Sequence, residues 1–139
     1  MGISYERTYE GEPAMKLEAY SKGGIDRLNI KPERDGEVIK TTNMVRNIYN
    51  QREKIAGPDL ALSAHAYLAR ALATAAIAIA EEEGINVVGF SGGVALNEII
   101  SLTIRRVVSE AGLRYVSNVA IPPGDGGVSF GQAYLASLQ

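Results

Sequence analysis

Apolar residues recur at helical spacing along most of the chain, and short β-branched runs interrupt them. Helices are predicted over residues 13–21, 43–54, 58–83, 96–111 and 128–137, and short buried strands over residues 85–90 and 113–116. Two further brief runs, 25–30 and 37–41, flank a stretch with an Asp35-Gly36 turn signal and predict neighbouring strands. The helix over 58–83 is alanine-rich and apolar on most sides, so we expect it to be buried on more than one face.

The order of these elements predicts an α/β fold. Two hairpin-like strands are followed by helix, strand, helix, strand and helix, and a unit of strand, glycine-rich turn and helix occurs twice. Turns that follow consecutive parallel strands lie at one edge of the sheet, where open α/β sheets bind ligands. We therefore expect a short mixed or mostly parallel sheet flanked by helices, as in one lobe of a two-lobed, ribonuclease-H-like nucleotide-binding fold.

The first glycine turn lies in the stretch from Gly89 to Asn97, with sequence GFSGGVALN. Glycines allow the backbone to approach a ligand closely, and the free N–H groups at the start of a helix favour an anion. The turn is either a phosphate or nucleotide cradle or a Gly-Gly corner without a ligand. Asn97 either reaches a ribose or phosphate oxygen with its amide or is an ordinary polar residue at a helix start.

The second glycine turn holds a carboxylate, Asp125, between Gly124 and Gly126. A carboxylate in such a turn can bind a divalent cation, or it can cap the helix that follows in an Asx-type turn. His65 is the single histidine, so this chain cannot form a multi-histidine metal centre. We expect it to be a helix-face histidine that is hydrogen-bonded to a neighbour.

The composition of the chain narrows the function classes. At 139 residues with 46% hydrophobic and 22% charged residues, one globular domain is expected. The formal net charge of −2 gives no basic footprint for a nucleic acid. The absence of cysteine excludes disulfides and thiolate metal sites. No run reaches the roughly 18 apolar residues of a membrane span, so we expect a cytoplasmic protein without a membrane partner.

Three blocks of the sequence resemble the carboxy-terminal part of HypF, the family of hydrogenase-maturation carbamoyltransferases. They are residues 9–19 (YEGEPAMKLEA), 91–97 (SGGVALN) and 122–133 (PPGDGGVSFGQA). The resemblance implies an actin-like, two-lobed fold that is shared with the tRNA threonylcarbamoyltransferases. Residues 1–139 would then be a single domain, the second lobe of a carbamoyltransferase domain, and a fragment of a larger chain.

The resemblance also implies an activity and a site. In that family a carbamoyl-adenylate, formed from carbamoyl phosphate and ATP, delivers its carbamoyl group to the C-terminal cysteine of HypE, for nickel–iron hydrogenase maturation. By position, Asp125 would be a metal ligand, and Glu10 and Gly11 would approach the sugar or base of the nucleotide. The residues that would line the nucleotide are Ser91, Gly92, Gly93 and Asn97.

One departure from the family qualifies these expectations. The family completes its metal site with a histidine pair in the preceding lobe, and this chain has no such pair. A divalent metal, zinc or iron, would need ligands from outside the chain, and the isolated chain is expected to be inactive. HypE and the preceding lobe are the implied partners. The alternatives are a tRNA threonylcarbamoyltransferase lobe, which residues 10–19 fit less well, and a noncatalytic scaffold that docks a partner protein.

Overall fold

The computed structural model describes residues 1–138. The chain forms two compact units, Met1–Leu72 and Ala73–Gln139. Helix α3 (Gly57–Glu82) contributes residues to both units. The expected α/β class is confirmed, with one antiparallel and one parallel strand pair among helices. The expectation that residues 1–139 form a single domain stays a prediction.

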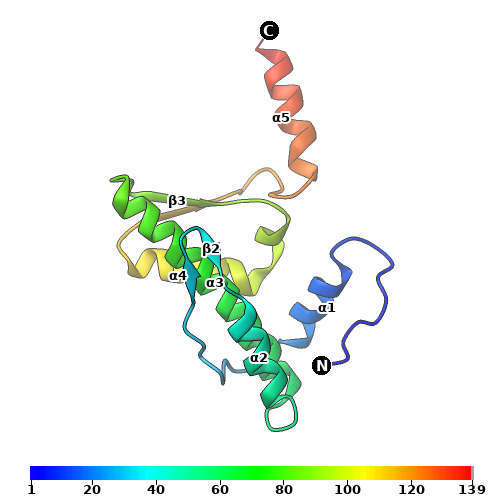
Figure 1. Cartoon of the computed structure of the whole chain (residues 1–139). Helices are drawn as coiled ribbons and strands as arrows, with labels where there is room; N and C mark the ends of the chain where they lie inside the picture. The colour runs from blue at the N-terminus through cyan, green and yellow to red at the C-terminus, as the bar shows by residue number, and fades with distance from the viewer. Residues whose placement is uncertain (139) are drawn as a thin grey trace. The chain divides into compact units, whose positions relative to one another are not determined.

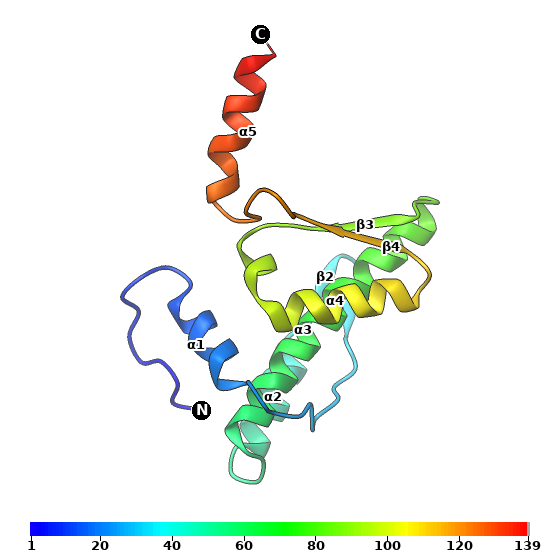
Figure 2. The ribbon, with the colours of Figure 1, turned by 180° about the vertical axis from the view of Figure 1, so that it is seen from behind.

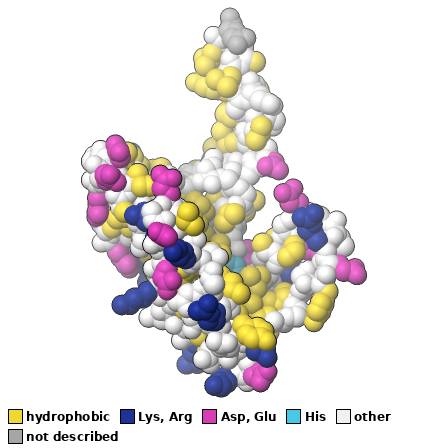
Figure 3. Space-filling view, viewed as in Figure 1, with side chains coloured by type: hydrophobic (Ala, Val, Ile, Leu, Met, Phe, Trp, Pro, Cys, Tyr) yellow, Lys and Arg dark blue, Asp and Glu magenta, His cyan; other side chains and the backbone are white. Residues whose placement is uncertain are grey.

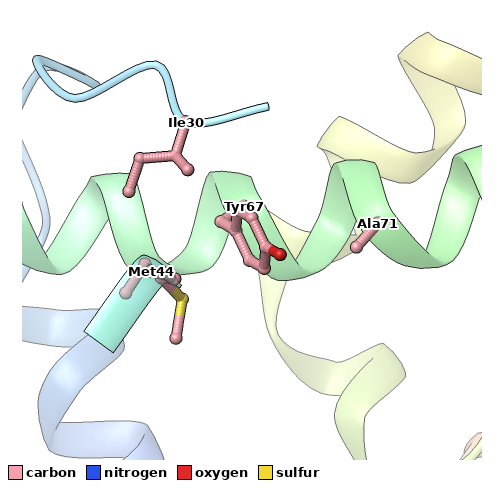
Figure 4. Close-up of a cluster of buried hydrophobic side chains, with 5 residues drawn as sticks. Ile30, Met44, Tyr67 and Ala71 are labelled. Carbon is pink, nitrogen blue, oxygen red and sulfur yellow. The ribbon is translucent and has the colours of Figure 1, made fainter. Parts of the chain in front are cut away.

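The first unit contains two helices and a small hairpin besides the first part of α3. It contains α1 (Glu12–Tyr20), β1 (Arg34–Asp35), β2 (Val38–Ile39) and α2 (Thr42–Gln51). The strands pair antiparallel across the Asp35-Gly36 turn. The buried cluster at its centre comprises Ile30, Met44, Ala64, Tyr67 and Ala71 (Figure 4). Three separate segments of the chain therefore share one apolar core.

Helix α3 is buried on several faces, as its sequence predicts. The consecutive residues from Ser63 to Tyr67 are all buried, and no single helix face could contain five successive positions. By length and composition alone, α3 is also apolar enough to cross a membrane, although no uninterrupted apolar run suggested it. Ala64, Tyr67 and Ala71 of α3 lie in the core of the first unit, and one such helix is weak evidence for a membrane span.

The strand predicted over residues 25–30 is wrong. This segment runs along α3 without strand structure, and side chains of α3 accept from two of its backbone amides. Asp59 accepts from the Ile25 amide at 2.8 Å, and Ser63 accepts from the Leu28 amide at 3.3 Å. Because polar side chains supply the partners that a neighbouring strand would supply, the apolar run does not need a sheet. The strand that pairs with residues 38–39 is instead Arg34–Asp35.

The second unit repeats strand, turn and helix, as expected. It contains β3 (Val87–Phe90), a short 3-10 helix η1 (Gly93–Leu96), α4 (Glu98–Glu110), β4 (Arg114–Ser117) and α5 (Gly126–Ser137). β3 and β4 pair in parallel from Val87↔Arg114 to Phe90↔Ser117, with α4 as the connection (Figure 2). α4 buries Ile100, Ile104 and Val108, which its helical repeat places on one face.

Two features of the second unit differ from a plain strand, turn and helix repeat. The helix predicted from Leu96 begins at Glu98, because residues 93–96 form the 3-10 turn and Asn97 is the residue that caps α4. α5 has no buried residue, and it extends from the second turn toward the C-terminus (Figure 1). It carries no charged residue, and apolar side chains lie along it (Figure 3).

The hydroxyl of Tyr67 generates a first prediction. Tyr67 is fully buried, and its hydroxyl accepts from the Glu33 amide at 3.2 Å and donates to the Lys40 carbonyl. Tyr67→Phe leaves both backbone groups without this partner, so the free energy of unfolding should fall by ~1–3 kcal/mol in denaturant titrations. Tyr49→Phe, at an exposed aromatic residue, is the matched control and should stay within about 0.5 kcal/mol of the wild type. Equal stability of the two variants would contradict a bracing role for Tyr67.

Candidate functional site

The two glycine turns meet at the carboxyl edge of the parallel pair. The Gly92 amide donates to the Pro123 carbonyl oxygen at 2.9 Å, and the Ser91 hydroxyl lies 3.5 Å from the same oxygen. A Cβ atom added at Gly124 would lie 3.7 Å from the Cα of Gly93. The turns therefore touch through their backbones, and the expected placement of both at one sheet edge is confirmed.

The first turn presents an open backbone surface. Gly92 has φ +100° and ψ 172°. Residues with a side chain rarely adopt this backbone conformation, which explains the glycine at this position. Gly92 and Gly93 are both exposed, and nothing lies within 4 Å of the Cβ position of either residue. A ligand could therefore approach the backbone here without meeting a side chain.

Asn97 is committed in part to the fold. Its side-chain oxygen accepts from the Ile100 amide at 3.0 Å, which makes it the N-cap of α4. This contact is the ordinary role of a polar residue at a helix start. The other side-chain atom, the amide nitrogen, makes no hydrogen bond within residues 1–138 and can still donate to a ligand. A nucleotide contact by Asn97 stays a prediction that concerns this nitrogen alone.

Asp125 holds the corresponding position at the second turn but does not cap its helix. It is the N-cap residue of α5, with φ −55° and no side-chain hydrogen bond to the helix. The Asx-type cap that was the alternative to a metal ligand is therefore not formed. Its carboxylate is exposed and makes no ion pair among the residues that the structure describes. The carboxylate is free to bind a cation.

A groove at the same edge contains polar residues that the sequence did not single out. It is an open depression of about 460 Å³, lined by Gly89, Phe90, Ser91, Val116, Ser117 and Asn118. Ser117 ends β4 and Asn118 follows it, as Ser91 follows β3. Polar residues directly after a predicted strand were the signal that could have indicated them. The groove adds hydroxyl and amide groups next to the first glycine turn.

His65 is a helix-face histidine, as expected. It is buried in α3, and its Nδ1 lies 2.8 Å from the Ala61 carbonyl oxygen, one helical turn earlier. In the part of the chain that the structure describes, no group of three His, Cys, Asp or Glu side chains could hold a metal ion. Asp125 fits a metal site only as a single ligand.

Glu10 and Gly11 form a separate turn in the first unit. Gly11 precedes α1 with φ +79°, and Glu10 is exposed. The buried carboxylate of Glu12 stabilises this turn: it accepts from the Thr8 amide at 2.5 Å and the Thr8 hydroxyl at 2.9 Å, and it pairs with Lys16 at 2.6 Å. The Lys16 ammonium and then the Thr8 donors lower the pKa of Glu12 from 4.5 to about 2. The turn that carries Glu10 is thus held in one conformation.

Comparison with known proteins identifies the family. The family model described as "Carbamoyltransferase, Kae1-like Domain, second subdomain" matches residues 1–132. The chain belongs to this family. The expected second lobe of a HypF-type protein and the actin-like fold class are therefore both confirmed.

Individual relatives agree with this assignment. The chain is 35% identical over 138 residues to the probable carbamoyltransferase HypF of Methanocaldococcus jannaschii, covering 95% of this chain and 17% of the relative. The crystal structure of T. kodakarensis HypF matches with a TM-score of 0.88 at 42% identity, covering 99% of this chain and 18% of that one. Full-length HypF in a phosphate- and nucleotide-bound form matches with a TM-score of 0.83 at 28% identity, with 97% and 18% covered. The chain thus spans less than a fifth of these relatives.

The lowered pKa of Glu12 predicts a pH-dependent stability. Its folded-state pKa lies below its ordinary value, so its stabilisation is complete above pH 4.5 and is lost as the pH falls toward about 2. Glu12→Gln should be less stable than the wild type at pH 6, and this difference should disappear between pH 4.5 and about 2. Denaturant unfolding at several pH values measures the difference. Glu10→Gln, at an exposed carboxylate, is the control and should match the wild type throughout; a constant deficit in Glu12→Gln would contradict the ionic role.

Proposed function

We propose that residues 1–139 supply one wall of the active site of a HypF-type carbamoyltransferase. The observation that carries this proposal is the contact of the two glycine turns at the carboxyl edge of β3 and β4. In the proposed reaction the complete protein transfers a carbamoyl group from carbamoyl-adenylate to the C-terminal cysteine of HypE. The chain itself supplies backbone, amide and carboxylate groups, and the rest of the reaction requires domains outside these residues.

The nucleotide part of the proposal uses mainly the backbone of the first turn. The open faces of Gly92 and Gly93 would contact ATP or carbamoyl-adenylate, assisted by the Ser91 hydroxyl and the Asn97 amide nitrogen. The family resemblance also assigns Glu10 and Gly11 to the sugar or base of the nucleotide, and this assignment stays a prediction. A related HypF has been solved in a phosphate- and nucleotide-bound form, which supports a nucleotide as the ligand class. A hydroxyl, an amide and accessible backbone donors are suited to ribose and phosphate oxygens.

The metal part of the proposal uses Asp125. An exposed carboxylate without an internal partner can donate an oxygen to zinc or iron, with the remaining ligands from outside this chain. When bound, the cation would neutralise negative charge on the phosphate groups. Asp125 would contribute one ligand. The hydrogen bond from Gly92 to Pro123 would keep the turn that carries Asp125 beside the first turn. The isolated chain should therefore be inactive.

The partners are proposed on chemical grounds. α5 is uncharged and exposes Val128, Phe130, Tyr134 and Leu135, which favours burial against further protein such as the preceding lobe of the same polypeptide. HypE is the proposed acceptor protein, and the cytoplasm is the proposed location. The net charge of −2 does not favour tRNA as a partner.

Asn97 separates the nucleotide site from a simple helix cap. Serine caps a helix about as well as asparagine, so Asn97→Ser keeps the acceptor for Ile100 but removes the amide donor. In the complete polypeptide, calorimetry with ATP or AMP should show an affinity about tenfold lower, with little change in stability. Asn97→Ala should in addition lose ~1 kcal/mol of stability. Wild-type affinity in Asn97→Ser would restrict Asn97 to capping, and no heat with the wild type would favour a noncatalytic scaffold.

Asp125 tests the metal proposal. Because its carboxylate makes no hydrogen bond or ion pair with residues 1–138, Asp125→Ala should leave the complete protein folded while bound metal and carbamoyl transfer are both lost. Elemental analysis by mass spectrometry measures the metal, and circular dichroism measures the fold. Asp35→Ala, at an exposed aspartate of the β1–β2 hairpin, is the matched control and should retain both properties. Full metal content in Asp125→Ala would refute the ligand role.

A further inference from the structure

A serine outside the three resemblance blocks forms a hydrogen bond to the first glycine turn. Ser101 lies in the first part of α4, and its hydroxyl donates to the Ala95 carbonyl oxygen at 2.7 Å. Serine hydroxyls within helices usually bond to the carbonyl three or four residues earlier. Here the acceptor is six residues earlier, in η1, which precedes the helix. The bond therefore joins α4 to the turn instead of satisfying the helix itself.

The turn has few other means of keeping its shape. η1 has four residues, and its backbone bonds run from the Ala95 amide to the Gly92 carbonyl at 2.9 Å and from the Asn97 amide to the Val94 carbonyl at 3.0 Å. Such short 3-10 turns are generally weaker elements than α-helices. Gly92, at its N-terminal side, is fixed through the Pro123 carbonyl, and Asn97, at its other side, is fixed as the cap of α4. Ala95 lies between these two anchors, and Ser101 is the side chain that holds it. All of these contacts leave the Gly92–Gly93 face open.

We propose that Ser101 is a positioning residue for nucleotide binding. It does not contact the ligand: its hydroxyl fixes the Ala95 carbonyl, and thereby η1 and the Gly92–Gly93 backbone, in the geometry that the nucleotide meets. This inference rests on the proposed nucleotide site at the first turn. A turn that is already ordered loses less conformational entropy when a ligand binds, so fixing it raises affinity without a new contact.

The test compares serine variants of α4 in the complete polypeptide. Ser101→Ala should raise the Kd for ATP, measured by calorimetry, about threefold to tenfold, the range expected for one hydrogen bond. The rate of carbamoyl transfer at saturating ATP should not change, because the reacting groups stay in place. Ser109→Ala is the matched control: Ser109 is an exposed serine of the same helix, so the substitution changes helix propensity equally.

Two conservative variants separate positioning from a structural role. Ser101→Thr keeps a hydroxyl and should restore most of the affinity, and Ser101→Cys, a weaker donor, should give an intermediate Kd. A Ser101→Ala protein that unfolds at a lower temperature but binds ATP with wild-type affinity would overturn the inference. If Ser101→Ala does not fold, equal affinities of Ser101→Cys, Ser101→Thr and the wild type would overturn it. If the wild type itself does not bind ATP, the proposed nucleotide site is wrong. That result is distinct from a failure of the Ser101 inference, because it needs no variant.

Discussion

The carbonyl oxygen of Pro123 joins the two turns on which the candidate site depends. Parallel pairing brings the ends of β3 and β4 to one edge, but it does not determine where the loops beyond them go. The backbone hydrogen bond from the Gly92 amide to the Pro123 carbonyl holds the two loops together. Proline has no N–H of its own, so the Pro122-Pro123 segment offers its neighbour only acceptors. The first glycine turn and the turn with the carboxylate are consequently fixed to each other.

The same principle operates in the first unit, where side chains replace missing backbone partners. Asp59 and Ser63 hold the segment that runs along α3, and Tyr67 holds the two ends of the hairpin. Buried or half-buried backbone groups need partners, and segments without regular structure obtain them from polar side chains. The polar groups of Asp59, Ser63 and Tyr67 thus serve the fold. A polar or charged residue therefore indicates a function only where its side chain is not already used in hydrogen bonds that stabilise the fold.

The sequence predicted the elements whose signals are local. The alanine-rich periodicity of α3 and the glycine after β3 both lead directly to what the structure contains. Residues 25–30 failed because an apolar run does not reveal whether its backbone partner is a strand or a side chain distant in sequence. The contacts of Ser101 and Pro123 were not predictable, since hydrogen bonds to backbone carbonyls leave no spacing pattern. The resemblance blocks identified the family, yet they could not show which site residues also stabilise the fold.

Asn97 and Asp125 show how the fold divides these duties. Each is the N-cap residue of the helix after a glycine turn, so their positions in the sequence predict the same capping role for both. The side-chain oxygen of Asn97 caps α4, whereas the carboxylate of Asp125 makes no hydrogen bond to α5. A carboxylate at a helix start could cap the helix, but that of Asp125 makes no such contact among the described residues, which is why we propose a role for it outside the fold. In the proposed site, the nucleotide contacts would therefore depend on backbone that the fold holds in place. The proposed metal ligand would be a carboxylate that makes no ion pair or cap contact among the described residues.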